Sequence, residues 1–183
     1  MNYYIDIELK PDAEFRVNVL LNKVYTKFHK VLFDIQANDV GVSFPNYKVL
    51  LGSKLRIHGR EERLGLFKEG DWLGGLSGYC QVSDIQEVPN NAQFRTVSRK
   101  QQNMTNAKLN RLLKRGSITQ DAAKAYRVKM YSQGLSEGYL ELESVSNGQK
   151  HRRYIVLGDL QMKPALGEFD VFGLSKSATI PWF

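Results

Sequence analysis

The chain has 183 residues, which is enough for one large domain or two small ones. Its 42% hydrophobic and 11% aromatic content is ordinary for a globular protein, and no apolar run approaches the roughly 20 residues of a membrane span. The single cysteine, Cys80, excludes an internal disulfide and a metal site built from cysteines. Because Asp6 and Glu8 interrupt the first apolar residues, we expect no signal peptide and a cytoplasmic protein.

The net charge of +7 is concentrated in the second half of the chain. Residues 1–94 carry 11 basic and 12 acidic side chains, a net charge of −1. Residues 95–183 carry 15 basic and 7 acidic side chains, a net charge of +8. This asymmetry predicts a polyanionic partner for the second half, and it favours nucleic acid over a membrane surface.

Hydrophobic periodicity predicts six elements in the first half of the chain. Their order, β-α-β-β-α-β, is that of the ferredoxin-like arrangement, which we assign to residues 1–93. That arrangement hosts many functions, including RNA binding, so it does not decide the activity. The expected elements are strands at Tyr3–Leu9, Val40–Phe44, Lys54–His58 and Tyr79–Glu87, and helices at Glu14–Gln36 and Glu61–Leu73.

Two histidines belong to these elements. His29 lies about 120° from the middle of the apolar stripe of the first helix, next to Tyr25, and hence at the edge of the buried face. His58 ends a strand. A histidine in either position is more often a partly exposed packing residue than a functional one, so we expect packing roles unless other residues indicate a site.

The stretch from Phe94 to Gly116 contains seven Lys or Arg residues and no acidic residue. Phe94–Arg99 is expected to form a strand, and a short helix then runs from Asn106 as N-cap to Gly116 as the residue after its C-cap. A helix kept only for solubility usually carries Glu–Lys pairs, which are missing here, so the sequence favours a row of cations for a phosphate backbone. At about 100° per residue, that row comprises Lys108, Arg111, Lys114 and Arg115, opposite Leu109, Leu112 and Leu113.

Residues 94–183 are expected to form a second, α/β domain, which makes the whole chain α+β. A further helix is predicted at Gln120–Tyr131, with Thr119 as N-cap. Asn147-Gly148 between two strand-like runs predicts a β-hairpin with a type I′ turn. The hairpin places Ser144 and Ser146 on one arm and Lys150, His151, Arg152 and Arg153 on the other.

The available side chains permit one kind of RNA chemistry. No His or Cys pair has metal-ligand spacing and the acidic residues are scattered, so we expect no metal site. RNA carries its own nucleophile, the 2′-hydroxyl, which one histidine as general base and a cationic pocket can activate without a metal. The same route cannot cut DNA. On residues alone, an RNA-binding module without catalysis and a basic DNA-binding domain remain alternatives.

Several motifs follow one another along the chain in a recognisable order. They resemble those of the type I-F CRISPR repeat endoribonucleases, the family that processes precursor CRISPR RNA, and the resemblance covers the whole chain. The motifs are the opening strand, KFHK (Lys27–Lys30), GVSFP (Gly41–Pro45), KLRIH (Lys54–His58), VSRKQ (Val97–Gln101), SVSNGQ (Ser144–Gln149) and GLSKSATIPWF (Gly173–Phe183).

The resemblance implies a fold, an activity and partners. It implies a ferredoxin-like domain followed by a C-terminal domain with an arginine-rich helix. It implies cleavage of an RNA hairpin at the 3′ base of its stem without metal or cofactor, leaving a 2′,3′-cyclic phosphate. It also implies that the protein stays on the mature guide RNA as a subunit of an interference complex.

The resemblance further implies roles for individual residues. His29 takes the place of the family's catalytic histidine, the general base toward the 2′-hydroxyl. Ser144, with Ser146 close by, takes the place of the serine that holds the cleaved ribose. Arg99 and Gln101 match the linker pair that reads base edges near the bottom of the stem. The other expected RNA contacts are Lys108, Arg111, Lys114, Arg115, Gln149, His151 and Arg152.

Two departures from the family pattern concern the expected site. Phe172 stands where the family commonly has a tyrosine beside the histidine, so a hydrogen bond that orients the imidazole must come from elsewhere. His151 stands where relatives have an aromatic ring that stacks near the stem base, and an imidazole stacks less strongly. Asn110 and Leu112 replace arginines that relatives often carry, which thins the cation row. These changes keep open the alternative of an inactive RNA-binding subunit.

Overall fold

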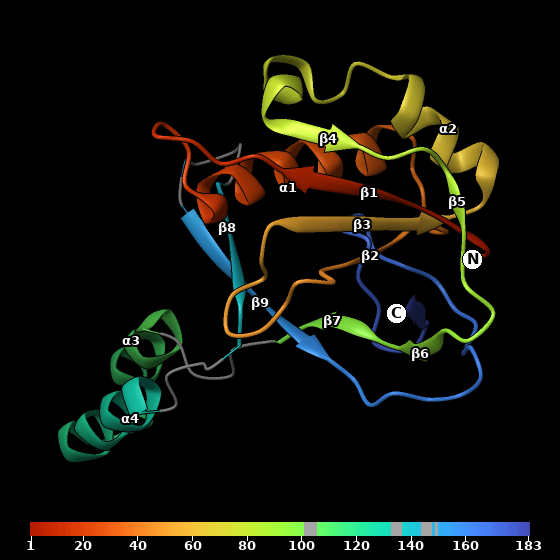
Figure 1. Cartoon of the computed structure of the whole chain (residues 1–183). Helices are drawn as coiled ribbons and strands as arrows, with labels where there is room; N and C mark the ends of the chain where they lie inside the picture. Colours follow the sequence, from red (N-terminus) through yellow and green to blue (C-terminus); the bar gives the residue numbers. More distant parts are fainter. Residues whose placement is uncertain (101–105, 133–136, 144–147, 149) are drawn as a thin grey trace. The chain divides into compact units, whose positions relative to one another are not determined.

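The computed structural model describes residues 1–100, 106–132, 137–143, 148 and 150–183 (Figure 1). Contacts divide the chain into a larger unit, Met1–Arg99 with Glu137–Phe183, and a smaller one, Lys100–Ser136. This division differs from the expected boundary between residues 93 and 94, because strands from both halves of the sequence share the core of the larger unit. The fold is mixed α+β with antiparallel sheets, as the sequence predicts.

The first half of the chain builds the main sheet of the larger unit. Its elements are β1 (Tyr3–Leu9), α1 (Val17–Asp34), β2 (Gly41–Ser43), β3 (Lys54–Gly59), α2 (Glu61–Glu69), the 3₁₀ helix η1 (Gly74–Tyr79), β4 (Cys80–Val82) and β5 (Gln86–Glu87). The strands lie in the order β2-β3-β1-β4, with β5 also paired to β1, and every neighbouring pair is antiparallel. The predicted β-α-β-β-α-β order of elements is therefore observed.

The predicted fourth strand is two short strands, because the chain bulges between β4 and β5. The hydroxyl of Ser83 accepts a hydrogen bond from the amide of Asp6 at 2.9 Å, and the Ser83 amide donates to the Asp6 carbonyl. The main-chain amide and carbonyl of Asp6 therefore both bond to Ser83, and the regular ladder between the two strands is interrupted there.

α1 ends where Gln36 adopts a φ of 49°. The amide of Ala37 donates to the carbonyl of Leu32, a closure typical of helix C-termini.

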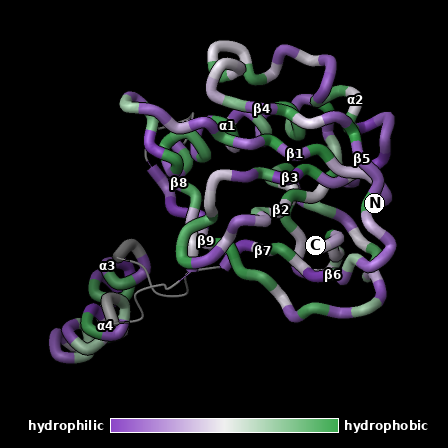
Figure 2. Tube along the Cα trace, in the orientation of Figure 1, coloured by the Kyte–Doolittle hydropathy of each residue, from purple (hydrophilic) through white to green (hydrophobic). Residues whose placement is uncertain are grey.

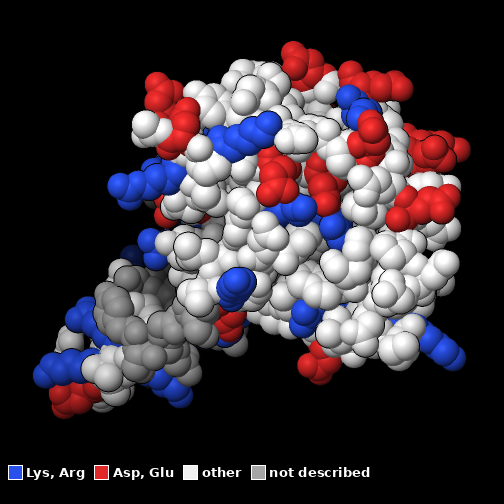
Figure 3. Space-filling view, viewed as in Figure 1, with Lys and Arg blue, Asp and Glu red and all other residues white. Residues whose placement is uncertain are grey.

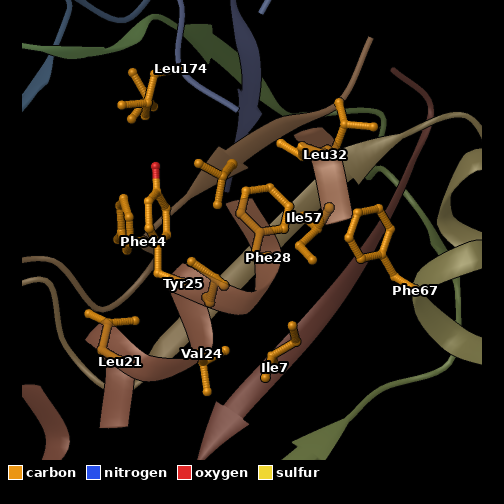
Figure 4. Packing of buried hydrophobic residues seen from close by; sticks show 14 of the residues in the cluster. Ile7, Leu21, Val24, Tyr25, Phe28, Leu32, Phe44, Ile57, Phe67 and Leu174 are labelled. Atoms are coloured by element: carbon orange, nitrogen blue, oxygen red, sulfur yellow. The ribbon is translucent and has the colours of Figure 1, made fainter. Parts of the chain in front are cut away.

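α1 and α2 cover the same face of the main sheet. Along β1 and β3, hydrophilic and hydrophobic residues alternate, so one face of each strand is apolar (Figure 2). Phe28 of α1 is fully buried, lies beside Ile57 of β3, and contacts the ring of Phe67 of α2 at 5.6 Å between centroids (Figure 4). Each such ring stabilises the fold by about 1.5–3 kcal/mol. This packing fixes the position of α1, the helix that carries His29.

The second half of the chain adds two small sheets to the same unit. β6 (Gln93–Arg95) pairs with β10 (Ile180–Trp182), and β7 (Val97–Arg99), β9 (Lys150–Leu157) and β8 (Tyr139–Glu143) form a three-stranded sheet in that order. The predicted strand Phe94–Arg99 is thus split into two strands that pair with different partners, and the carbonyl of Thr96 between them accepts the amide of Gly158. The β8–β9 pairing confirms the predicted hairpin. A two-residue turn at Asn147-Gly148 would pair Glu143 with Arg152, whereas Glu143 pairs with Lys150, so the observed register does not fit the predicted type I′ turn; Gly148 has a φ of 64°. Asn147 lies outside the described residues.

The smaller unit consists of α3 (Asn106–Lys114) and α4 (Gln120–Ser132). Gly116 has a φ of 65°, and the amides of Gly116 and Ser117 donate to carbonyls of the last turn of α3, which confirms Gly116 as the residue after the C-cap. The hydroxyl of Thr119 accepts a hydrogen bond from the amide of Ala122 at 3.2 Å, as expected for an N-cap.

None of the helices in the described ranges is both long and apolar enough to cross a bilayer.

His58 corrects an expectation, because it is fully buried rather than partly exposed. Its Nε2 lies 2.8 Å from the hydroxyl of Ser43 on the neighbouring strand β2, and its Nδ1 has no hydrogen-bond partner in the described part of the chain. The face of the sheet that carries it is covered by the C-terminus: the guanidinium of Arg56 lies between the rings of Tyr4 and Phe183, at 4.4 and 4.1 Å from their centres. His58 is therefore a structural residue.

Burial holds the pKa of His58 well below its ordinary value, and the positive charges of Arg56 and the N-terminus lower it further. In the unfolded chain His58 binds a proton near pH 6.5, whereas the folded protein keeps it neutral. Below that pH the unfolded state binds more protons, so the free energy of unfolding should fall by up to about 1.4 kcal/mol per pH unit.

Urea unfolding of the wild type between pH 7.5 and 5.5 measures this loss, and a His58→Gln variant serves as the control. The variant should lose less free energy of unfolding over the same interval. Equal losses in the two proteins would show that His58 does not couple folding to pH.

Candidate active site

α1 directs two side chains, one helical turn apart, at the same short loop near the C-terminus. We call residues Asp170–Leu174 the 170–174 loop. Tyr25 is fully buried, and its hydroxyl donates to the carbonyl of Phe172 at 2.6 Å. His29 is half-buried, as its place at the edge of the apolar stripe predicts, and contacts the preceding residue of the loop.

The 170–174 loop fixes which nitrogen of His29 carries a proton. Nδ1 of His29 lies 2.7 Å from the carbonyl oxygen of Val171. Because a carbonyl can only accept, Nδ1 must donate, and the proton of a neutral imidazole therefore resides there. Nε2 is left with its lone pair, which is the form that a general base requires.

The ring of Phe172 fixes the plane of the imidazole. The two ring centroids lie 3.7 Å apart and the planes differ by 12°, so the rings are stacked. Phe172 has no hydroxyl, and the main-chain carbonyl of Val171 supplies the orienting hydrogen bond instead. His29 is thus held by one hydrogen bond in its plane and one aromatic contact on its face.

The loop is rigidly built for this role. The carboxylate of Asp170 accepts the amides of Phe172 and Leu174 at 2.9 and 3.0 Å, which closes the turn. Gly173 has a φ of 69°, and a Cβ there would lie 3.1 Å from the ring of Phe28. Only glycine allows the loop to approach α1 so closely.

A second basic residue lies on the other side of Phe172. The guanidinium carbon of Arg153, on β9, is 3.4 Å from the centre of the Phe172 ring, a cation–π contact. The ring therefore separates Arg153 from His29. Burial lowers the pKa of Arg153, and the charge of Arg99 lowers it further. No role for Arg153 follows from the sequence, because only the packing of the hairpin against the 170–174 loop places it here.

Strand alternation sorts the predicted RNA-contacting residues of the hairpin. Arg99 on β7 lies opposite Ile155 on β9, so Arg99, Arg153 and His151 share one face of this sheet. Arg152 points to the other face, where its guanidinium lies 4.6 Å from the ring centre of Tyr139. Arg99 and His151 are both exposed, so the face that holds Phe172 also carries accessible basic groups.

The cation row predicted on α3 is present on the smaller unit. The side chains of Lys108, Arg111, Lys114 and Arg115 are all exposed, and Leu109 is fully buried. Arg111, Lys114 and Arg115 form no ion pair with any described residue. In contrast, acidic side chains cluster over α2, β4 and β5 on the face of the molecule in Figure 3.

Four predicted site residues lie outside the described residues. They are Gln101, Ser144, Ser146 and Gln149. Ser144 and Ser146 follow β8 directly in sequence, and Gln149 precedes β9. Within the described ranges, no group of three or more His, Cys, Asp and Glu side chains is arranged to hold a metal ion.

The fold and the site define an α+β protein in which one histidine, oriented by a main-chain carbonyl and an aromatic ring, lies near basic side chains. The model of the family described as "CRISPR-associated protein (Cas_Csy4)" matches residues 4–183. The chain therefore belongs to this family, which confirms the resemblance drawn from the sequence motifs.

Individual relatives agree with the family match. The chain is 36% identical over 184 residues to "CRISPR-associated endonuclease Cas6/Csy4" of Escherichia coli (strain UTI89 / UPEC), with 100% of both chains covered. It is 33% identical over 187 residues to the protein of the same name from Pseudomonas aeruginosa (strain UCBPP-PA14), again with 100% of both chains covered. A solved structure described as "Structure A of CRISPR endoribonuclease Cse3 bound to 19 nt RNA" aligns over 100% of both chains with 13% identity and a TM-score of 0.43.

The hydroxyl of Tyr25 should contribute measurably to the free energy of unfolding, because it donates a hydrogen bond to the main-chain carbonyl of Phe172. Burial raises the pKa of Tyr25 far above its ordinary value, so the hydroxyl stays protonated and donates. Tyr25→Phe should lower the free energy of unfolding by about 1–3 kcal/mol, measured by urea denaturation. Tyr3→Phe is the matched control, since the Tyr3 hydroxyl has no hydrogen bond within the described residues. Equal stabilities of the two variants would contradict the role of Tyr25.

Proposed function

We propose that this protein is a metal-independent endoribonuclease that cuts precursor CRISPR RNA at the 3′ base of the repeat stem-loop. The observation that carries the proposal is the state of His29, whose Nδ1 is occupied by the Val171 carbonyl and whose Nε2 has no hydrogen bond to any residue that the structure describes. The family membership and the names of the two relatives give independent support for an RNA endonuclease.

In the proposed reaction, Nε2 of His29 accepts the proton of the 2′-hydroxyl at the cut site. The 2′-oxygen attacks the adjacent phosphorus, the bond from phosphorus to the 5′-oxygen of the next nucleotide breaks, and a 2′,3′-cyclic phosphate forms. The Val171 carbonyl stabilises the imidazolium that results, since it accepts from Nδ1 in both protonation states. Ser144, with Ser146 beside it, holds the ribose so that the hydroxyl faces His29.

The rest of the chain would hold the RNA. In this proposal residues 1–93 are a ferredoxin-like domain that carries the base, and residues 94–183 bind the hairpin. Arg99 and Gln101 read base edges near the bottom of the stem. The major groove of A-form RNA is too deep and narrow for ordinary side-chain readout, so the basic residues of α3 contact phosphates. The further RNA contacts in this proposal are Lys108, Arg111, Lys114, Arg115, Gln149, His151 and Arg152.

We further propose that the protein remains on the mature guide RNA, in the cytoplasm, as a subunit of a type I-F interference complex. A second candidate function follows from the same surface: an RNA-binding subunit that caps the guide without cutting it. The absence of a hydroxyl on Phe172 and the replacement of a larger ring by His151 favour this alternative. The Val171 hydrogen bond favours the enzyme, because it orients the imidazole without that hydroxyl.

Removal of His29 should separate cleavage from binding. His29→Ala should abolish single-turnover cleavage of the repeat hairpin and leave its affinity within about twofold, because the base makes no essential binding contact. Lys30→Ala, an exposed neighbour on α1, is the control and should cut normally.

Cleavage in EDTA should be unimpaired, and a 2′-deoxy substitution at the cut site should block cleavage. Normal cutting by His29→Ala would refute the mechanism, and wild type that binds but does not cut would favour the capping subunit.

Binding should depend steeply on salt, because phosphates are the main contacts of α3. If about four to six phosphates are engaged, log affinity should fall with log salt at a slope of about −3 to −5. Replacement of Arg111, Lys114 and Arg115 by Gln should make the slope shallower by about one per lost contact. The measurement is a fluorescence titration of the hairpin at several salt concentrations. A slope near zero in the wild type would exclude the α3 row as a phosphate-binding surface.

A further inference from the structure

Arg153 is a charged side chain with no ionic partner among the described residues. It is half-buried, and its Nε is shielded from solvent without a hydrogen bond to any of them. The nearby Asp170 carboxylate is already accepting two main-chain amides. The guanidinium stacks on the ring of Phe172.

Such an arrangement costs free energy in the absence of a ligand. A cation removed from water needs a paired anion, or the lost hydration is not replaced. Burial lowers the pKa of Arg153, and the charge of Arg99 on the same sheet face lowers it further, while Tyr25 and Asp170 act in the opposite direction. Two guanidinium groups on one face are suited to a phosphate, which accepts several N–H bonds at once.

The place of Arg153 indicates which phosphate. Its guanidinium and the imidazole of His29 cover opposite faces of the same Phe172 ring. His29 and Arg153 thus lie 3.7 and 3.4 Å from the centre of one ring, so a nucleotide bound at Nε2 of His29 is adjacent to the ring that Arg153 covers.

We propose that Arg153 binds the phosphate at the cut site, as the electrostatic partner of His29. The inference rests on the proposed function and completes it: His29 removes the proton, and Arg153 donates hydrogen bonds to the non-bridging oxygens as negative charge accumulates on them. After cleavage the same guanidinium holds the terminal phosphate of the product. Arg153 makes and breaks no covalent bond.

The competing role is purely structural, with Arg153 acting only as a cover for Phe172. Binding of two product hairpins distinguishes the roles, one ending in a 3′-phosphate at the cut site and one ending in a 3′-hydroxyl. If Arg153 contacts the phosphate, the wild type should bind the phosphorylated product about 10- to 100-fold more tightly, as for a charge-assisted hydrogen bond. Arg153→Gln should lose this preference, and its affinity for the 3′-hydroxyl product should stay within about threefold of wild type.

Two further variants complete the test. Arg153→Lys keeps the charge and should retain part of the preference for the phosphorylated product that Arg153→Gln loses. Lys163→Gln removes one exposed positive charge elsewhere and should behave as wild type in both titrations. Thermal melting of each variant checks that it is folded before the titrations are compared.

The outcomes separate this inference from the proposed function. In single-turnover assays of the all-ribose hairpin, Arg153→Gln should be about 10²- to 10³-fold slower than wild type, the loss typical for one oxyanion donor. If the folded Arg153→Gln variant keeps the phosphate preference and the wild-type rate, Arg153 is not the phosphate ligand, while the endonuclease stands. If the wild type itself does not cut but prefers the phosphorylated end, the proposed enzyme fails and the phosphate site stands.

Discussion

The site depends on the contact between α1 and the 170–174 loop. α1 is anchored by Phe28 and its neighbours in the core, and the loop is anchored to α1 by Tyr25 and the close approach of Gly173. The carbonyl of Val171 and the ring of Phe172 are consequently presented to His29 from a rigid framework.

This framework explains how the chain accommodates a phenylalanine beside its histidine. A side-chain hydroxyl can orient an imidazole, but a main-chain carbonyl does so with equal geometric precision and is less easily lost by mutation. The stacked ring adds a second restraint, and Arg153 covers its other face. The same ring that lacks a hydroxyl thereby connects the proposed base to the proposed phosphate ligand, which argues for a working site over a degenerate one.

The larger unit also shows how its buried histidine differs from the one proposed as the base. His58 is enclosed, bonded to Ser43, and held neutral by burial, so we expect it to contribute to the pH dependence of stability. His29 is half-buried, with Nδ1 bonded to the backbone and Nε2 without a hydrogen bond to the described residues. From the sequence, both histidines are expected to be partly exposed packing residues. The end of a strand, where His58 lies, and the edge of an apolar stripe, where His29 lies, do not specify which residues pack over the side chain.

Much of this protein was determined by local patterns in the sequence. The alternation of β1, the apolar stripe of α1, the Gly116 and Thr119 caps and the hairpin all follow from short-range physics, and the motifs identified the family. Only the tertiary structure decided that the predicted fourth strand is interrupted at Ser83, between β4 and β5, that the halves share a core, and that Arg153 stacks on Phe172. Those features depend on contacts between residues far apart in the chain, about which periodicity carries no information.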